Sequence, residues 1–284
     1  MASFTNQATL TYNGISTNSN IAFGEILDVL SVTKTVVEDS YTQGDTVTYV
    51  VSLRNTGSSA LTNLTITDDL GAYTYGGNTV YPLTYVTGST LYFVNGALQP
   101  APAVTAGPPL SITGISIPAN GDAVIVYQTL ANAFANPEAG GSVVNTVTVS
   151  GDGLSAPITA TATVNAQTAA NLSISKSITP SQVVDNDRIT YTFVIQNSGN
   201  EAIIATDDAI VNDLFNPILS ALTVTFEGTT WTDGTEYNYN EATGQFTTVA
   251  GNITVPAATY TRDAVTGEYI LTPGIATLVV TGTV

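Results

Sequence analysis

Cysteine and histidine are absent from this chain of 284 residues, and basic residues are scarce, with five lysines and arginines against 22 aspartates and glutamates. Without cysteine or histidine, the chain lacks the usual zinc and copper ligands, a thiol nucleophile and the base of a Ser-His-Asp triad. A formal net charge of −17 repels phosphate backbones, so we expect no nucleic-acid partner. We also expect no metal, no cofactor and no enzymatic turnover.

Long hydrophobic runs are missing as well. No apolar segment approaches the roughly 20 residues that a membrane-spanning helix needs, so we expect no membrane insertion. The first ten residues, MASFTNQATL, have neither the basic start nor the apolar core of a secretory signal. The sequence therefore predicts no secretory signal.

Short alternating segments dominate what is present. Threonine, valine, isoleucine and tyrosine recur in runs with a period of two, punctuated by 24 glycines and 12 prolines. No long segment keeps the 3.6-residue apolar period of a helix. The pattern predicts an all-β protein built from immunoglobulin-like β-sandwiches.

An internal repeat defines two domains. The sequence LSVTKTV from Leu30 recurs as LSISKSI from Leu172, and GDTVTYVVSLRNTGS recurs as NDRITYTFVIQNSGN at the same offset of 142 residues. A repeat of this length is a whole domain rather than a solenoid unit. We assign residues 30–151 and 171–284 to two β-sandwich domains, with linkers at 15–29 and 152–170.

A second, circularly shifted repeat joins the N-terminus to the first domain. The segment SFTNQATLTYNG, residues 3–14, matches SVVNTVTVSGDG, residues 142–153, which follows the strand-like segment AVIVYQTL. The equivalent segment of the second domain, ATLVVTGTV at 276–284, has no such strand after it. We therefore interpret residues 1–14 as a donor strand and expect residues 3–13 to complete the second domain of the next subunit.

Polar residues interrupt the apolar rows of these strands at matching places. Because residues of one parity share a strand face, Lys34, Asp68 and Asn145 are expected to meet in one core. In the second domain Lys176 and Asp213 take the first two places, and Asn6 of a neighbouring subunit would supply the third. The apolar row of the donor strand consists of Phe4, Asn6, Ala8, Leu10 and Tyr12.

Lysine, aspartate and asparagine side chains in one core allow a covalent reaction. Burial favours the neutral amine of lysine, which can attack the asparagine amide while a protonated aspartic acid (Asp68 or Asp213) polarises the carbonyl. Lys34 would join Asn145 within one chain, and Lys176 would join Asn6 between chains. A buried Lys-Asp salt bridge with asparagine as a hydrogen-bond partner is the unreactive alternative.

The motifs LSVTKTV, GDTVTY, RNTG, TITDDL and VVNTVTVSG together resemble the bacterial and archaeal surface repeat called domain of unknown function 11. The resemblance covers the first domain and the second as far as its missing strand. The second domain departs from the pattern with NDRITY in place of GDTVTY and VNDLF in place of TDDL. It implies immunoglobulin-like modules with an extracellular, structural role at the cell surface. Isopeptide chemistry is not implied by this resemblance.

The sequence thus predicts a subunit of an extracellular filament that assembles with copies of itself, head to tail. The alternative function is a surface adhesin whose aromatic loops bind glycans or a host protein. The alternative arrangement is self-complementation, in which residues 4–12 fold back into their own second domain.

Overall fold

The computed structural model describes residues 2–26 and 29–284. Its regular elements are strands apart from one 3-10 turn. The chain divides into two compact units. The first consists of Met1–Asn136 and Ser142–Asn165, and the second of Pro137–Gly141 and Ala166–Val284. Each unit contains an immunoglobulin-like β-sandwich, so the predicted tandem all-β architecture is confirmed. We call these sandwiches domain 1 and domain 2.

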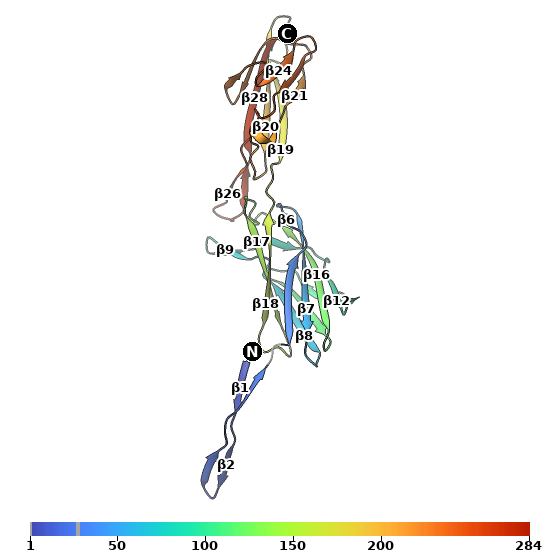
Figure 1. Cartoon of the computed structure of the whole chain (residues 1–284), viewed down its shortest axis with the longest axis vertical. Coiled ribbons are helices and arrows are strands. Elements are labelled where there is room, and N and C mark those ends of the chain that lie inside the picture. Colours follow the sequence, from blue (N-terminus) through green and yellow to red (C-terminus); the bar gives the residue numbers. More distant parts are fainter. Residues whose placement is uncertain (1, 27–28) are drawn as a thin grey trace. The chain divides into compact units, whose positions relative to one another are not determined.

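The first sheet of domain 1 contains β5 (Leu30–Val36), which carries Lys34, and its neighbour β7 (Thr46–Asn55). Strand β7 alternates buried and half-exposed residues, and its core row consists of Val47, Tyr49, Val51 and Leu53. Figure 1 shows β7 and β16 side by side in this sheet. The strand order is β13 (Ala97–Leu98), β12 (Leu91–Val94), β16 (Asp122–Ala131), β7 (Thr46–Asn55) and β5 (Leu30–Val36), with β11 (Leu83–Tyr85) also paired to β16.

The second sheet of domain 1 carries Asp68 and Asn145. Leu64 and Ile66 share the buried row of β8 with Asp68, as the period of two predicts. The strand order is β14 (Ala103–Thr105), β15 (Leu110–Ile117), β8 (Leu61–Asp68), β17 (Ser142–Ser150), β18 (Ile158–Ala166) and β6 (Ser40–Tyr41). A separate hairpin joins β9 (Tyr73–Tyr75) to β10 (Asn78–Val80).

Domain 2 repeats the first sheet but has a smaller second one. Its first sheet has the order β19 (Leu172–Thr179), β20 (Arg188–Asn197), β28 (Gly274–Thr283), β22 (Ser220–Phe226) and β23 (Thr229–Trp231). Its second sheet has the order β21 (Asn212–Leu214), β25 (Gln245–Thr248) and β24 (Tyr237–Asn240). A hairpin of β26 (Thr259–Arg262) and β27 (Tyr269–Thr272) and a 3-10 turn at Ala205–Asp207 complete the described elements.

The N-terminal segment is a hairpin that pairs only with itself among the described residues. Strand β1 (Ala2–Asn6) pairs with β4 (Ala22–Ile26), and β2 (Thr9–Tyr12) pairs with β3 (Ile15–Asn18). Asn13 and Gly14 form the turn with φ of 48° and 78°, the left-handed pair that favours tight hairpins. Its side chains from Phe4 to Phe23 are exposed.

Both predicted linkers contain strands, so neither is a simple connection. Residues 15–29 contain β3 and β4, which pair with the predicted donor strand and make it half of a hairpin. Residues 152–170 contain β18, which pairs with β17 over eight residue pairs and belongs to the sandwich of domain 1. The error arose because Ala- and Thr-rich edge strands such as ITATATVNA have a weak apolar alternation, which resembles a connecting segment.

Candidate functional site

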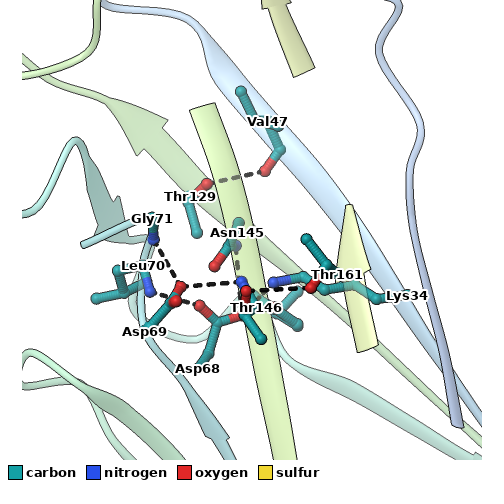
Figure 2. Close-up of polar contacts among 11 residues, drawn as sticks. Lys34, Val47, Asp68, Asp69, Leu70, Gly71, Thr129, Asn145, Thr146 and Thr161 are labelled. Atoms are coloured by element: carbon teal, nitrogen blue, oxygen red, sulfur yellow. Dashed lines mark hydrogen bonds and ion pairs between the residues drawn. The ribbon is translucent and has the colours of Figure 1, made fainter. Parts of the chain in front are cut away.

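Lys34, Asp68 and Asn145 meet in the core of domain 1. The ammonium nitrogen of Lys34 donates to Oδ2 of Asp68 at 2.8 Å, and Nδ2 of Asn145 donates to the same oxygen at 3.4 Å. Figure 2 shows the three side chains converging from three strands. Asp68 and Asn145 are fully buried and Lys34 is 5% exposed, so the charged pair lies in a medium of low polarity.

Two tyrosines complete this cluster, and sequence reasoning assigned neither of them to the site. The hydroxyl of Tyr127 donates to Oδ2 of Asp68, and the ring of Tyr49 lies under the Lys34 ammonium with a centroid distance of 4.5 Å. Tyr49 and Tyr127 stack on each other with centroids 5.8 Å apart. The signal was available, because both tyrosines occupy the buried rows of their strands.

The environment changes the proton affinity of Lys34 in the direction that nucleophilic attack requires. Burial lowers the pKa of Lys34 below its ordinary value, while the charge and hydrogen bond of Asp68 oppose that shift. Burial also raises the pKa of Tyr127 and of Tyr49 above 10, so both hydroxyls stay protonated at neutral pH. Burial thus favours the neutral form of the amine as well as that of both hydroxyls.

Asn145 presents a buried oxygen that has no hydrogen bond. Its Oδ1 has no partner within hydrogen-bonding geometry, while its Nδ2 faces Asp68. Rotation of the amide by half a turn would place Oδ1 at Asp68, where a protonated carboxyl group could donate to it. The Tyr49 hydroxyl is the other buried polar atom of the cluster that lacks a bond of this geometry, and Tyr49 interacts with the Asn145 side chain.

Domain 2 holds the matching lysine and aspartate without the asparagine. Lys176 donates to Oδ2 of Asp213, and its ammonium lies 4.3 Å from the ring centroid of Tyr191, the counterpart of Tyr49. The lysine side chain is 37% exposed and that of Asp213 17%, against 0% and 1% for Lys34 and Asp68. In domain 2, Val280 takes the place of Tyr127. Tyr127 pairs with Tyr49 across the ladder of domain 1, and Val280 pairs with Tyr191, the counterpart of Tyr49, in domain 2.

The exposure in domain 2 follows from an open edge beside Asp213. In domain 1, β8 pairs with β15 on one side and with β17 on the other, where Asp68 faces Val147. In domain 2, β21 pairs with β25, and none of the strands in residues 2–26 and 29–284 pairs with its other edge. A hollow of about 560 Å³ is lined by Asn212, Asp213 and Leu214 of β21 and by Gln245 of the paired strand β25.

The apolar row facing that edge is also uncovered. Every residue of β19 is exposed, including Leu172 at 43%, Ile174 at 55% and Ile178 at 42%. The matching strand β5 buries Leu30 at 5% exposure, because β17 packs against it. We define the acceptor groove, a name that anticipates the proposal below, as β19, the outer edge of β21 and the Lys176-Asp213 pair of domain 2.

The predicted donor residues are exposed, as strand donation would require. Phe4, Leu10 and Tyr12 are 54%, 67% and 73% exposed, and Asn6 and Ala8 are exposed on the same face of the hairpin. The structure does not bring Asn6 to Lys176 or Asp213 within one chain by any hydrogen bond among the described residues. Asn6 instead pairs with Ala22 in its own hairpin.

Other kinds of site are not apparent in the described ranges. No group of three or more acidic, histidine or cysteine side chains within residues 2–26 and 29–284 could hold a metal ion. In the same ranges, no helix has the length and apolarity needed to cross a membrane.

No family model and no curated protein matches this chain. Partial structural similarity exists to the pilus backbone protein of Streptococcus pneumoniae, at 11% identity and a TM-score of 0.33 over 86% of this chain and 56% of that one. The N-terminal domain of a Streptococcus gordonii adhesin gives 16% identity and a TM-score of 0.35 over 53% and 35%. The collagen-binding domain of a Staphylococcus aureus adhesin gives 15% and 0.31 over 49% and 99%.

The chain spans about a third or less of the first two solved structures it matches, 27% of a Clostridium perfringens glycoside hydrolase and 35% of the S. gordonii adhesin domain.

Proposed function

We propose that this chain is a structural subunit of an extracellular filament, in which the N-terminal segment of one subunit completes domain 2 of the next. The observation that carries the proposal is the open edge of β21 beside a Lys-Asp pair whose counterpart in domain 1 is completed by Asn145 on β17. The exposed row of Phe4, Asn6 and Leu10 matches the row that fills this place in domain 1.

Strand donation would remove two unfavourable features at once. The outer edge of β21 has no strand partner among the described residues, although the Leu214 amide donates to the Asp213 carboxylate, and the groove leaves apolar side chains in water. An added strand pairs with that edge and inserts alternate side chains into the groove. Phe4, Leu10 and Tyr12 would each contribute about 1.5 to 3 kcal/mol of binding free energy on full burial.

The geometry of this contact leads to a polymer rather than a dimer. The donor segment and the acceptor groove are different surfaces of one chain, so the contact is heterologous. A heterologous contact that repeats without closing a ring gives an open fibre. The filament would therefore grow head to tail, with one donor and one acceptor on every subunit.

A covalent link between subunits is the second part of the proposal. The Lys176 amine would attack Cγ of Asn6, and the new carbon-nitrogen bond would replace the bond to Nδ2. Asp213 would pass one amine proton to the departing nitrogen, which leaves as ammonia. Atoms and electrons balance without an oxidant or a cofactor, and fixed positions supply the effective concentration. The same reaction in domain 1 would join Lys34 to Asn145.

The deciding experiment compares boiled protein on a denaturing gel with the same sample in negative-stain electron microscopy. We expect filaments and a boiling-resistant ladder for the unmodified chain, and no ladder for Asn6→Ala or Lys176→Ala. The control is Asn18→Ala, which changes an exposed side chain of the same hairpin. The side chain of Asn18 accepts a hydrogen bond from the Thr9 hydroxyl. It should keep the ladder.

Each other outcome removes a defined part of the proposal. Filaments that boil to single subunits would retain strand donation and overturn the covalent link. Single subunits in both assays would overturn the filament and leave two arrangements, a self-complemented chain and an adhesin. Binding of immobilised glycan or host protein by such subunits would then favour the adhesin.

A further inference from the structure

The hairpin at the N-terminus shares one pairing with the hairpin β17–β18 in domain 1. Strand β17 pairs with β18 so that Asn145 stands opposite Ala162. Strand β1 pairs with β4 so that Asn6 stands opposite Ala22. A small residue therefore accompanies the asparagine on the same face in both hairpins, although the sequences of β18 and of residues 15–26 are dissimilar.

The face of the N-terminal hairpin continues from its first half into its second. Directly paired residues of an antiparallel ladder lie on one face, so Ile15 shares a face with Tyr12, and Gly24 with Phe4. Ile15 is 75% exposed, and the Phe4 ring covers the position that a Cβ on Gly24 would occupy, at 2.3 Å. The second half of the hairpin thus presents Ile15 on this face, while Phe4 covers Gly24.

The second sheet of domain 2 lacks more than one strand of the matching sheet in domain 1. Domain 1 continues outward from β8 through β17 and β18 to the two-residue strand β6, whereas domain 2 stops at β21 in the part of the chain that the structure describes. A single donated strand would fill the position of β17 alone. A donated hairpin would fill the positions of β17 and β18, the two long strands.

The order of strands after each hairpin is the same. Along the chain, β18 is followed by β19, the first strand of domain 2, and β4 is followed by β5, the first strand of domain 1. Seating of the hairpin on another subunit would therefore repeat, between subunits, the order hairpin then first strand that joins the two domains within one chain.

We infer that the donor is the whole hairpin of residues 2–26 from a second copy of this chain, with β1–β2 in the position of β17 and β3–β4 in the position of β18. The inference rests on the proposed function and adds a register to it. Because Val147 faces Asp68 and Thr148 faces Thr67 in domain 1, Ala8 would face Asp213 and Thr9 would face Asn212. Asn6 would then reach the Lys176-Asp213 pair.

The absence of cysteine makes disulfide mapping clean. Thr11 and Ser16 face each other with their hydroxyl oxygens 2.8 Å apart on the outer face of the hairpin, so Thr11→Cys with Ser16→Cys should lock the hairpin shut under oxidation. Under the inference, oxidised and reduced forms of this variant assemble to the same extent. Assembly of the reduced form alone would show that the strands must separate, which overturns the hairpin and leaves single-strand donation.

The register has its own test in a second variant. Thr9→Cys with Asn212→Cys should give a disulfide ladder on a non-reducing gel, and Thr5→Cys with Asn212→Cys, four residues away along the same strand row, should give at most a tenth of it. Equal ladders, or the reverse preference, would overturn the register. Failure of the unmodified chain to assemble would instead overturn the proposed function, so the two failures are distinguishable.

Discussion

Lys34 and Asp68 form a salt bridge of 2.8 Å in which neither side chain is more than 1% exposed, while the equivalent pair Lys176 and Asp213 is open to solvent. The difference lies in the neighbouring strand and not in the pair itself. In domain 1, β17 covers the lysine strand and brings Asn145 to the carboxylate. Domain 2 thus resembles domain 1 without the hairpin β17–β18.

The first prediction concerns the mass of the folded protein. In a Lys176→Met variant, which cannot link subunits through that residue, we expect an intact mass lower than the sequence mass by one ammonia, because Lys34 joins Asn145. Adding Asn145→Ala should restore the full mass, and tandem mass spectrometry should place the cross-link at residues 34 and 145. A full mass in the folded Lys176→Met protein would leave the cluster as a structural salt bridge.

The second prediction concerns stability. In the Asn145→Ala background, where Lys34 stays a free amine, Lys34→Met leaves the buried Asp68 without its counter-ion, so we expect the free energy of unfolding to fall by at least ~3 kcal/mol in urea titrations. The matched control is Arg54→Met, which breaks the exposed pair of Arg54 and Asp122 at 3.4 Å and should cost less than ~1 kcal/mol. Similar losses for the two variants would contradict the burial argument.

The third prediction is a pH dependence in the Asn145→Ala variant, in which Lys34 stays a free amine. Burial lowers the pKa of Lys34 in the folded state below the ordinary 10.5, so between the two values the unfolded chain binds more protons. The free energy of unfolding should therefore rise with pH through this window. Asp68 and Asp69 oppose the lowering, and Tyr49 and Tyr127 also face the amine.

The measurement compares unfolding of Asn145→Ala with that of Asn145→Ala plus Lys34→Met from about pH 7 to about pH 9.5. The upper limit avoids Tyr49 and Tyr127, whose pKa values are raised by burial and whose stabilisation is lost as pH rises beyond 10. We expect the stability difference to shift in favour of the lysine form as pH rises. A flat difference would mean that folding does not alter the proton affinity of Lys34.

Sequence parity was sufficient to place the cluster of domain 1. Alternation alone put Lys34 and Asp68 in apolar rows, and the structure shows both residues buried, although Val32 and Val36 in the row of Lys34 are only half-buried. The shared offset of the repeat also placed Tyr49 against Tyr191, which lie under the two ammonium groups. These features follow from the geometry of single strands, which depends on local sequence.

Pairing between strands was less accessible from the sequence. The segment ITATATVNA has threonine and alanine where a half-buried strand usually carries larger apolar residues, so β18 was taken for a linker. The role of the asparagine in the RNTG motif also depends on partners that are distant along the chain. The side-chain amide of the buried Asn55 donates to the carbonyl oxygens of Pro118 and Ser59 at 2.9 Å. The amide of Asn197 donates to the carbonyl oxygens of Glu201 and Pro256 in the same way.

The last prediction concerns hydrogen exchange during polymerisation. Backbone amides that gain a strand partner open only when that partner leaves, so those of residues 2–12 and of β21 should exchange at least ~100-fold more slowly in filaments than in freshly dissolved subunits. Residues 15–26 should slow as well if the hairpin enters whole. The internal reference is β20, which already lies between β19 and β28 and should not change. Slowing of residues 2–12 without slowing of β21 would place the donor on a different surface.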